Sequence, residues 1–346
     1  MEKLIFFNYS FEDLSKISDL VKTNDSFVSL LTGDIYDLRN YLVEEKIKKI
    51  TAVLDRNVYT RITGLVKQVK IPPHAVKDYR WAAAVMAFCQ IAEIIFQYGS
   101  SLQEYAFKNG GEAVLPEIEY FYRADNTDPK AFISYATGKT DYLDITSSSN
   151  ISPYKHKVTP SRWEEQIYDF RLNYILMLKV AILERDEGVN YKSMIKYIDW
   201  MEREFIFGGP AFHFANLLFS PARIKRMLKY RTKDDIRNIA WDLALIQHWK
   251  RDALKGLETN EPVLLITRDK VVKYISKRLT AEDMLEFKKH TVDPWIGNQR
   301  SGEAVFERYM NLHENRTRGT DSREKPTDLE LDKITIYLEK KLNPGN

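Results

Sequence analysis

The chain has 346 residues, 44% of them hydrophobic, which is enough to bury the core of one large domain or two smaller ones. Its 52 basic and 49 acidic residues give a formal net charge of +3, which excludes the strongly basic surface of a protein that coats DNA. The one cysteine, Cys89, excludes a disulfide framework within the chain and favours a reducing compartment.

The apolar stretches of the sequence are short. The N-terminal run Leu4–Phe7 is shorter than the apolar part of a signal peptide. The longest stretch, Ala82–Phe96, contains Gln90 and Glu93 and falls short of a membrane span. We therefore expect a cytoplasmic protein with no membrane segment.

Residues 1–110 have a pattern in which strands and helices alternate. Short β-prone runs predict three strands, at Leu4–Phe7, Phe27–Leu31 and Thr51–Leu54. Helical patterns are found at Ile35–Lys48, Val58–Val69 and Tyr79–Phe107. The first half of the last helix is apolar nearly all round, which is typical of a helix buried in a core.

The remainder of the sequence is mostly helical. A helix is predicted over Asp234–Leu254 and a strand over Val263–Thr267. We therefore predict an α/β fold, a parallel sheet flanked by helices, from residues 1–110 and 234–280. Residues 111–233 would form a mainly helical insertion. Residues 281–346 would form a helical C-terminal extension with a flexible, polar segment at 314–328.

Two of the predicted strands end in an aspartate. Asp55 follows Thr51–Leu54, and Asp269 follows Val263–Thr267. Parallel strands of an open α/β sheet bind ligands at their carboxyl ends, so we expect both carboxylates at that edge. Either residue could instead be a turn or cap residue, since aspartate favours both positions.

Two further carboxylates are predicted on helices beside these strands. Glu93 belongs to a polar stripe with Gln90 and Gln97, which on a surface helix would face solvent. Because the surrounding helix is apolar, we expect this stripe to face a cleft. Asp242 lies at the edge of an apolar helix face, where a carboxylate is costly to bury unless it is paired or bound to metal.

Clustered carboxylates repel one another unless a cation neutralises them. Carboxylate and water ligands suit Mg²⁺ or Mn²⁺, and such ions activate water for attack on a phosphodiester. The carboxylates of Asp55, Glu93, Asp242 and Asp269, if they gather in this way, would therefore suit Mg²⁺ or Mn²⁺.

The same segments resemble the PIN-domain nucleases. The run Asp55-Arg56-Asn57-Val58 is similar to that family's strand ending in Asp-x-Asn, and Thr267-Arg268-Asp269 is similar to its later strand ending in Thr-x-Asp. Glu93 and Asp242 stand where the family has acidic residues on helices. The chain departs from the family by the long insertion between Glu93 and Asp242, and by Val271 where a further acid is frequent.

The resemblance implies a metal-dependent endonuclease that cleaves RNA more often than DNA, such as a toxin or defence effector. It implies that Asp55, Glu93, Asp242 and Asp269 hold one or two Mg²⁺ or Mn²⁺ ions. It implies that Asn57 and Thr267 position the acidic residues by hydrogen bonds. Arg56 and Arg268, each beside a motif aspartate, could contact the substrate strand or neutralise the carboxylates.

A rival interpretation is a non-catalytic PIN-like module that binds a partner protein or nucleic acid, and a third is an α/β nucleotide-binding regulator. Basic residues in the insertion would be a solvated helix face by default, or a grip on a phosphate backbone. These residues are Arg223, Lys225, Arg226, Lys229, Arg231 and Lys233. An inhibitory or homo-oligomeric protein partner is compatible with either of the first two interpretations.

Overall fold

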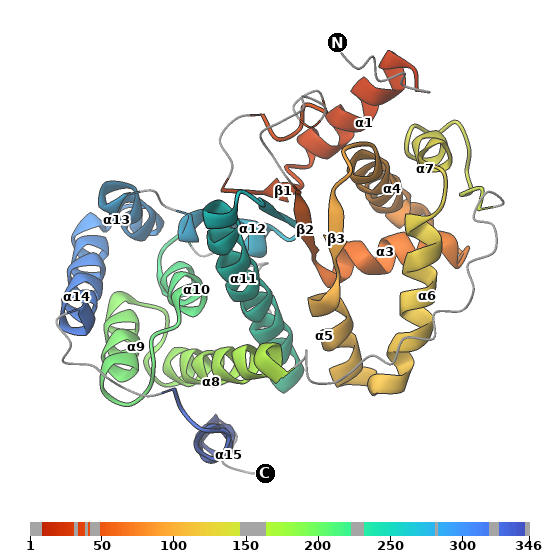
Figure 1. The fold of residues 1–346 in the computed structure, drawn as a ribbon. Helices are drawn as coiled ribbons and strands as arrows, with labels where there is room; N and C mark the ends of the chain where they lie inside the picture. The colour runs from red at the N-terminus through yellow and green to blue at the C-terminus, as the bar shows by residue number, and fades with distance from the viewer. Residues whose placement is uncertain are drawn as a thin grey trace. The chain divides into compact units, whose positions relative to one another are not determined.

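A computed structural model describes residues 9–30, 34–38, 41, 49–145, 164–222, 232–280, 283–317 and 325–342. The chain divides into two compact units. The first comprises residues 1–163 and 251–268, and the second comprises 164–250 and 269–346. Figure 1 shows the helices and strands of both units.

The first unit contains a small four-stranded sheet. Its strands are β1 (Phe27–Val28), β2 (Thr51–Leu54), β3 (Ile95–Gln97) and β4 (Val263–Ile266), in the order β1-β4-β2-β3. β2 runs parallel to both β3 and β4, whereas β1 pairs antiparallel with β4. The predicted α/β class is confirmed, but the sheet is mixed and not wholly parallel. Sheets of this class often carry one antiparallel edge strand, and β1 has only two residues.

Helices cover this sheet. They are α1 (Phe11–Thr23), α3 (Arg56–Val66), α4 (Val76–Ile91), α5 (Gly99–Asn109), α6 (Val114–Asp125) and α7 (Pro129–Ala136). α4 packs against α1 and α7, and α3 packs against α5 and α6. All four residues of β2 and of β4 are buried, as expected of strands covered on both faces.

The predicted long helix Tyr79–Phe107 is wrong. α4 ends at Ile91, and β3 and α5 follow. Glu93 takes a left-handed backbone conformation with φ 53°, and the Ile94 N–H donates to the Cys89 carbonyl at 2.8 Å. This is the Schellman arrangement that ends a helix and turns the chain. Its usual sequence signal, a glycine, is absent because Glu93 occupies that position.

The described residues of the second unit form helices and the turns and loops that join them, with no strand. It contains α8 (Glu164–Glu187), α9 (Tyr191–Arg203), α10 (Gly209–Phe219), α12 (Lys270–Leu279), α13 (Met284–Val292), α14 (Gln299–Thr317), α15 (Asp328–Leu342) and most of α11 (Lys233–Thr259). Buried aromatic residues fill its core, among them Tyr197, Phe212, Trp249 and Trp295. Asn216 of α10 donates a hydrogen bond to the carbonyl of Thr291, in the last turn of α13, at 2.9 Å. It also accepts one from Trp295 Nε1, just after that helix, at 2.7 Å.

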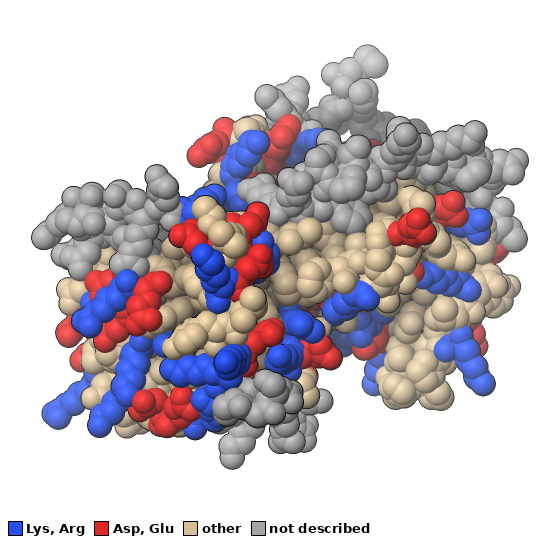
Figure 2. All heavy atoms as spheres, turned by 90° about the horizontal axis from the view of Figure 1, so that it is seen from below, with Lys and Arg blue, Asp and Glu red and all other residues tan. Residues whose placement is uncertain are grey.

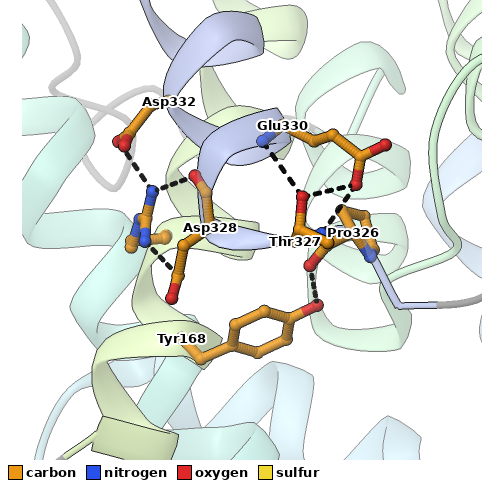
Figure 3. A network of polar contacts seen from close by, with 7 residues as sticks. Tyr168, Pro326, Thr327, Asp328, Glu330 and Asp332 are labelled. Carbon is orange, nitrogen blue, oxygen red and sulfur yellow. Dashed lines mark hydrogen bonds and ion pairs between the residues drawn. The ribbon is translucent and has the colours of Figure 1, made fainter.

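The C-terminal helix α15 packs on α8 within this unit. Figure 3 shows its amino end, where Thr327 and Glu330 form a capping box: the Thr327 N–H donates to Glu330 Oε2 at 2.7 Å. Arg171 of α8 binds the Asp328 side chain and donates to Asp332 Oδ1 at 2.7 Å. Tyr168 donates to the Pro326 carbonyl at 3.0 Å. Three polar contacts from Arg171 and Tyr168 therefore fix where α15 begins on α8.

The observed division differs from the predicted one. Helices α6 and α7, predicted in the insertion, belong to the first unit, and residues predicted as a separate extension join the second. Apolar packing decides this, because Phe121 and Phe132 are buried in the same core as β2 and β4. In the predicted flexible segment, 314–317 belong to α14 and Asp328 begins α15.

Some predicted features lie outside the described residues. These are the strand Leu4–Phe7, most of the helix Ile35–Lys48, all of the basic cluster except Lys233, and 318–324 of the polar segment. None of the described helices combines the length and the apolarity needed to cross a bilayer. The face seen in Figure 2 carries basic side chains interspersed with acidic ones, in keeping with the near-equal totals of 52 and 49.

Candidate functional site

The carboxyl ends of β2 and β4 meet at one edge of the sheet in the first unit. Asp55 directly follows β2 and is the N-cap of α3, where its Oδ1 accepts the Asn57 N–H at 2.9 Å. The residue is 2% exposed. Asp55 therefore has the helix-cap role that was expected as the alternative to metal binding. Asn57 contacts it through its backbone N–H, not through its side chain.

Thr267 engages the other carboxylate oxygen of Asp55. It directly follows β4, it is fully buried, and its hydroxyl donates to Asp55 Oδ2 at 2.6 Å. The Asp55 N–H donates to the Ile266 carbonyl at 3.0 Å. The hydrogen bond that the resemblance implied between Thr267 and an acidic residue is present, and it links the ends of two neighbouring strands.

An ion-pair network lies on the same side of the unit. Asp78, in the first turn of α4, binds Arg268 through one oxygen and Arg61 through the other, the second at 3.1 Å. Arg268 also lies over the ring of Trp81, 5.1 Å from its centroid. Partial burial opposes ionisation of Asp78, but Arg268 and Arg61 outweigh it and hold the pKa of Asp78 below its usual value.

No sequence pattern marks Asp78 as a site residue, because an aspartate in a first helical turn is common. No sequence pattern marks Arg61 as a site residue either. Arg268 was expected at this edge, and it is there, paired with Asp78 and not with a motif aspartate.

Arg56 belongs to a separate cluster between α3, α5 and α6. Its guanidinium lies 4.3 Å from the centroid of the Tyr105 ring and 3.6 Å from Glu117 Oε2. Glu117 is 6% exposed and also binds Lys67. Tyr59 donates to the Glu117 carbonyl at 2.6 Å. Arg56 therefore neutralises Glu117, which the sequence did not single out.

Glu93 lies at the other edge of the sheet from Asp55. β3 begins at Ile95, which is level with Thr51 at the start of β2. Asp55 is four positions beyond that level, about 13 Å along the strand at about 3.3 Å per residue. Glu93 precedes Ile95. The expected meeting of Asp55 and Glu93 at one edge is therefore wrong, because the helix that was to carry Glu93 ends before it.

An open pocket of about 600 Å³ lies at this second edge. Glu93, Asp125 and Asp128 line it together with the rings of Tyr98 and Phe121. Gln90 supports its wall, since its side-chain amide donates to the Asp125 and Thr127 carbonyls at 3.0 Å each. Gln90 and Glu93 therefore do border a hollow, as the polar stripe predicted.

Asp242 and Asp269 belong to the second unit. Asp269 is the N-cap of α12, where its Oδ1 accepts the N–H groups of Val271 and Val272 at 2.7 and 3.1 Å. This is the helix-cap role that aspartate favours, the alternative to metal binding. Asp242 is half-buried within α11, between buried Trp241 and Leu243.

These positions do not fit the predicted metal. Among the residues that the structure describes, no group of three or more His, Cys, Asp or Glu side chains is placed to hold an ion. One carboxylate oxygen of Asp55 accepts a backbone N–H at the start of α3, and the other accepts the Thr267 hydroxyl. Glu93 lies at the opposite edge of the sheet. No hydrolytic step through Mg²⁺ or Mn²⁺ is therefore derived from these residues.

Comparisons with protein-family models, with curated proteins and with solved structures found no match.

Replacing Glu93 by glycine is expected to stabilise the first unit by about 0.5–1 kcal/mol, because glycine takes a positive φ without steric cost. Glu93→Ala, which keeps the strained backbone, is the matched control and should not stabilise. Urea unfolding of both variants measures the difference. A loss of stability in Glu93→Gly would mean that the Glu93 side chain has a structural role beyond its backbone turn.

Proposed function

We propose that the first unit is a non-catalytic, PIN-like module that binds nucleic acid, RNA more likely than DNA. One observation carries the proposal: Asp78 holds Arg61 and Arg268 together on the carboxyl-edge side of the sheet. Their side chains are 27% and 35% exposed, so the guanidinium groups can reach a ligand. Two arginines on one carboxylate leave a positive excess, and guanidinium groups match phosphate oxygens in geometry.

The burial of Asp55 supports the non-catalytic part of the proposal. A carboxylate that caps a helix and accepts a buried threonine hydroxyl contributes to stability by those bonds. The PIN-like part rests on Asp55 ending the strand beside β4 and on the Thr267 hydrogen bond to it. The cytoplasm, predicted from the cysteine content, remains the expected location.

Fluorescence anisotropy with a labelled single-stranded RNA tests the proposal in the full chain. The double variant Arg61→Ala/Arg268→Ala is expected to bind roughly tenfold more weakly, and the slope of log affinity against log salt should fall by about 1.4 for two lost phosphate contacts. Arg80→Ala is the matched control, because the Arg80 side chain is also 35% exposed and pairs with Asp141. Equal affinities for the double variant and the wild type, or no binding by the wild type, would refute the proposal.

A metal-dependent endonuclease is the second candidate, and the hydrogen bond between Thr267 and Asp55 favours it. Incubation of RNA with the protein and millimolar Mg²⁺ or Mn²⁺ distinguishes the two. We expect no cleavage. Cleavage that is lost in both Asp55→Asn and Asp269→Asn, with folding retained, would instead establish the endonuclease.

A further inference from the structure

The second unit contains a pocket of about 360 Å³ that the proposed function does not use. Its polar wall is formed by His213 of α10, Lys250 of α11 and Arg278 of α12. Its apolar wall includes the rings of Phe212, Phe287 and Tyr309. Small-molecule sites commonly have this construction, an apolar lining with a few convergent polar groups.

Lys250 has no ion-pair partner among the described residues. The residue is half-buried and makes no hydrogen bond or ion pair with any residue that the structure describes. Burial lowers the pKa of Lys250. An ammonium group removed from water is costly unless an anion approaches it, so Lys250 favours a bound anion.

Arg278 adds a second positive charge. Its guanidinium lies over the Tyr274 ring, 3.2 Å from the centroid, and its Nε has no hydrogen-bond partner among the described residues. Asp293 acts on Arg278 only through its charge. The one carboxylate on the pocket wall is that of Asp283, which caps α13 by accepting the Glu286 N–H at 2.8 Å.

His213 also lines this pocket and has an unused polar atom. It is 2% exposed, and its Nδ1 has no hydrogen-bond partner among the described residues. Burial lowers the pKa of His213 to about 3, and nearby positive charges act in the same direction. The charges that act on it are those of Arg278, Lys250 and His290. His213 is therefore neutral near pH 7 in a basic environment and can hydrogen-bond a ligand.

The amino end of α10 also favours an anion in the pocket. Gly208 caps this helix without a side chain, and its first turn has no acidic residue. Gly209, the first residue of the helix, lines the pocket. The positive end of the helix dipole is therefore not neutralised by the protein, and such ends bind phosphate.

The aromatic wall suits a flat ring. The centroids of Phe287 and Tyr309 are 4.5 Å apart, and those of Phe212 and Tyr309 are 4.9 Å apart. Aromatic side chains hold nucleobases by stacking. We propose that this pocket binds a nucleoside monophosphate, with its phosphate beside Lys250 and Arg278 and its base against Tyr309. A free nucleotide and the phosphorylated end of an RNA offer the same chemistry.

Isothermal titration of the full chain with AMP tests this proposal. Lys250→Met and Arg278→Met are each expected to raise the Kd at least roughly tenfold, because each removes a charge-assisted contact to phosphate. Adenosine lacks the phosphate. Its Kd for the wild type should therefore be at least as high as the Kd of AMP for these two variants. Lys255→Met, an exposed lysine on the same helix, is the matched control and should leave the Kd unchanged. A 5′-phosphorylated tetranucleotide that binds more tightly than AMP identifies an RNA end as the source.

Thermal unfolding keeps the proposal testable if a variant folds poorly. AMP should raise the Tm of the wild type, and Lys250→Met should be at least as stable as the wild type because it removes an unpaired, half-buried charge. No heat of binding with millimolar AMP, or an unchanged Kd in Lys250→Met, would overturn the proposal. It is independent of the first unit, so Arg61→Ala/Arg268→Ala should retain AMP binding even where RNA binding is lost.

Discussion

Glu117→Leu is expected to destabilise the first unit by about 3 kcal/mol. Breaking a buried ion pair by removing one partner costs about 3–5 kcal/mol, because the other charge stays buried without compensation. Here the lower end applies, since Lys67 is 26% exposed and can move toward water, whereas Arg56 is only 16% exposed. Urea unfolding, with hydrogen exchange read on α3 and α6, measures the loss.

The Glu117 prediction has two controls. Glu119→Leu changes an exposed carboxylate on the same helix and should alter stability by no more than about 0.5 kcal/mol. Glu117→Leu/Lys67→Met removes the pair as a whole and should recover at least half of the loss, since a buried pair and an apolar replacement are often similar in stability. A single Glu117→Leu variant as stable as the wild type would show that the cluster is not held by charge.

Two strands of the first unit could be predicted from the sequence almost to the residue. Thr51–Leu54 is β2, and the predicted Val263–Thr267 exceeds β4 by one residue. Both are short apolar runs bounded by polar residues, and this pattern is typical of a buried strand. β3 could not be predicted, because Ile95–Gln97 continues an apolar run that begins in α4. Only its pairing with β2 makes it a strand.

The candidate site was predictable in part for the same reason. Asp55 and Thr267 end strands, so their positions follow from the sheet. Asp78 reaches Arg61 and Arg268 only because α4 packs beside α3 and the end of β4. Such contacts join residues that are distant in sequence, and no local pattern marks them. Glu93 was misplaced because a left-handed residue other than glycine leaves no signal for the end of a helix.

Gly256→Ala is expected to destabilise the first unit by about 3 kcal/mol, although alanine is the better helix former by about 1 kcal/mol. Gly256 lies in the last turns of α11, and the Glu261 N–H donates to its carbonyl at 2.8 Å. Asn260, with φ 58°, turns the chain back so that an added Cβ would lie 2.3 Å from the Glu261 carbonyl oxygen. A backbone atom cannot move aside as a flexible side chain can.

The damage from Gly256→Ala should reach the sheet. Pro262 follows Glu261, and its carbonyl accepts the Thr51 N–H at 3.0 Å, so a displaced turn also displaces the start of β4 beside β2. Amides of β4 should therefore exchange faster with solvent than in the wild type. Gly99→Ala is the matched control: it also adds a methyl group in a helix, but nothing lies within 4 Å of the new Cβ, so it should stabilise by up to about 1 kcal/mol. Similar stability changes in both variants would mean that the turn after α11 yields, and that it does not fix the register of β4.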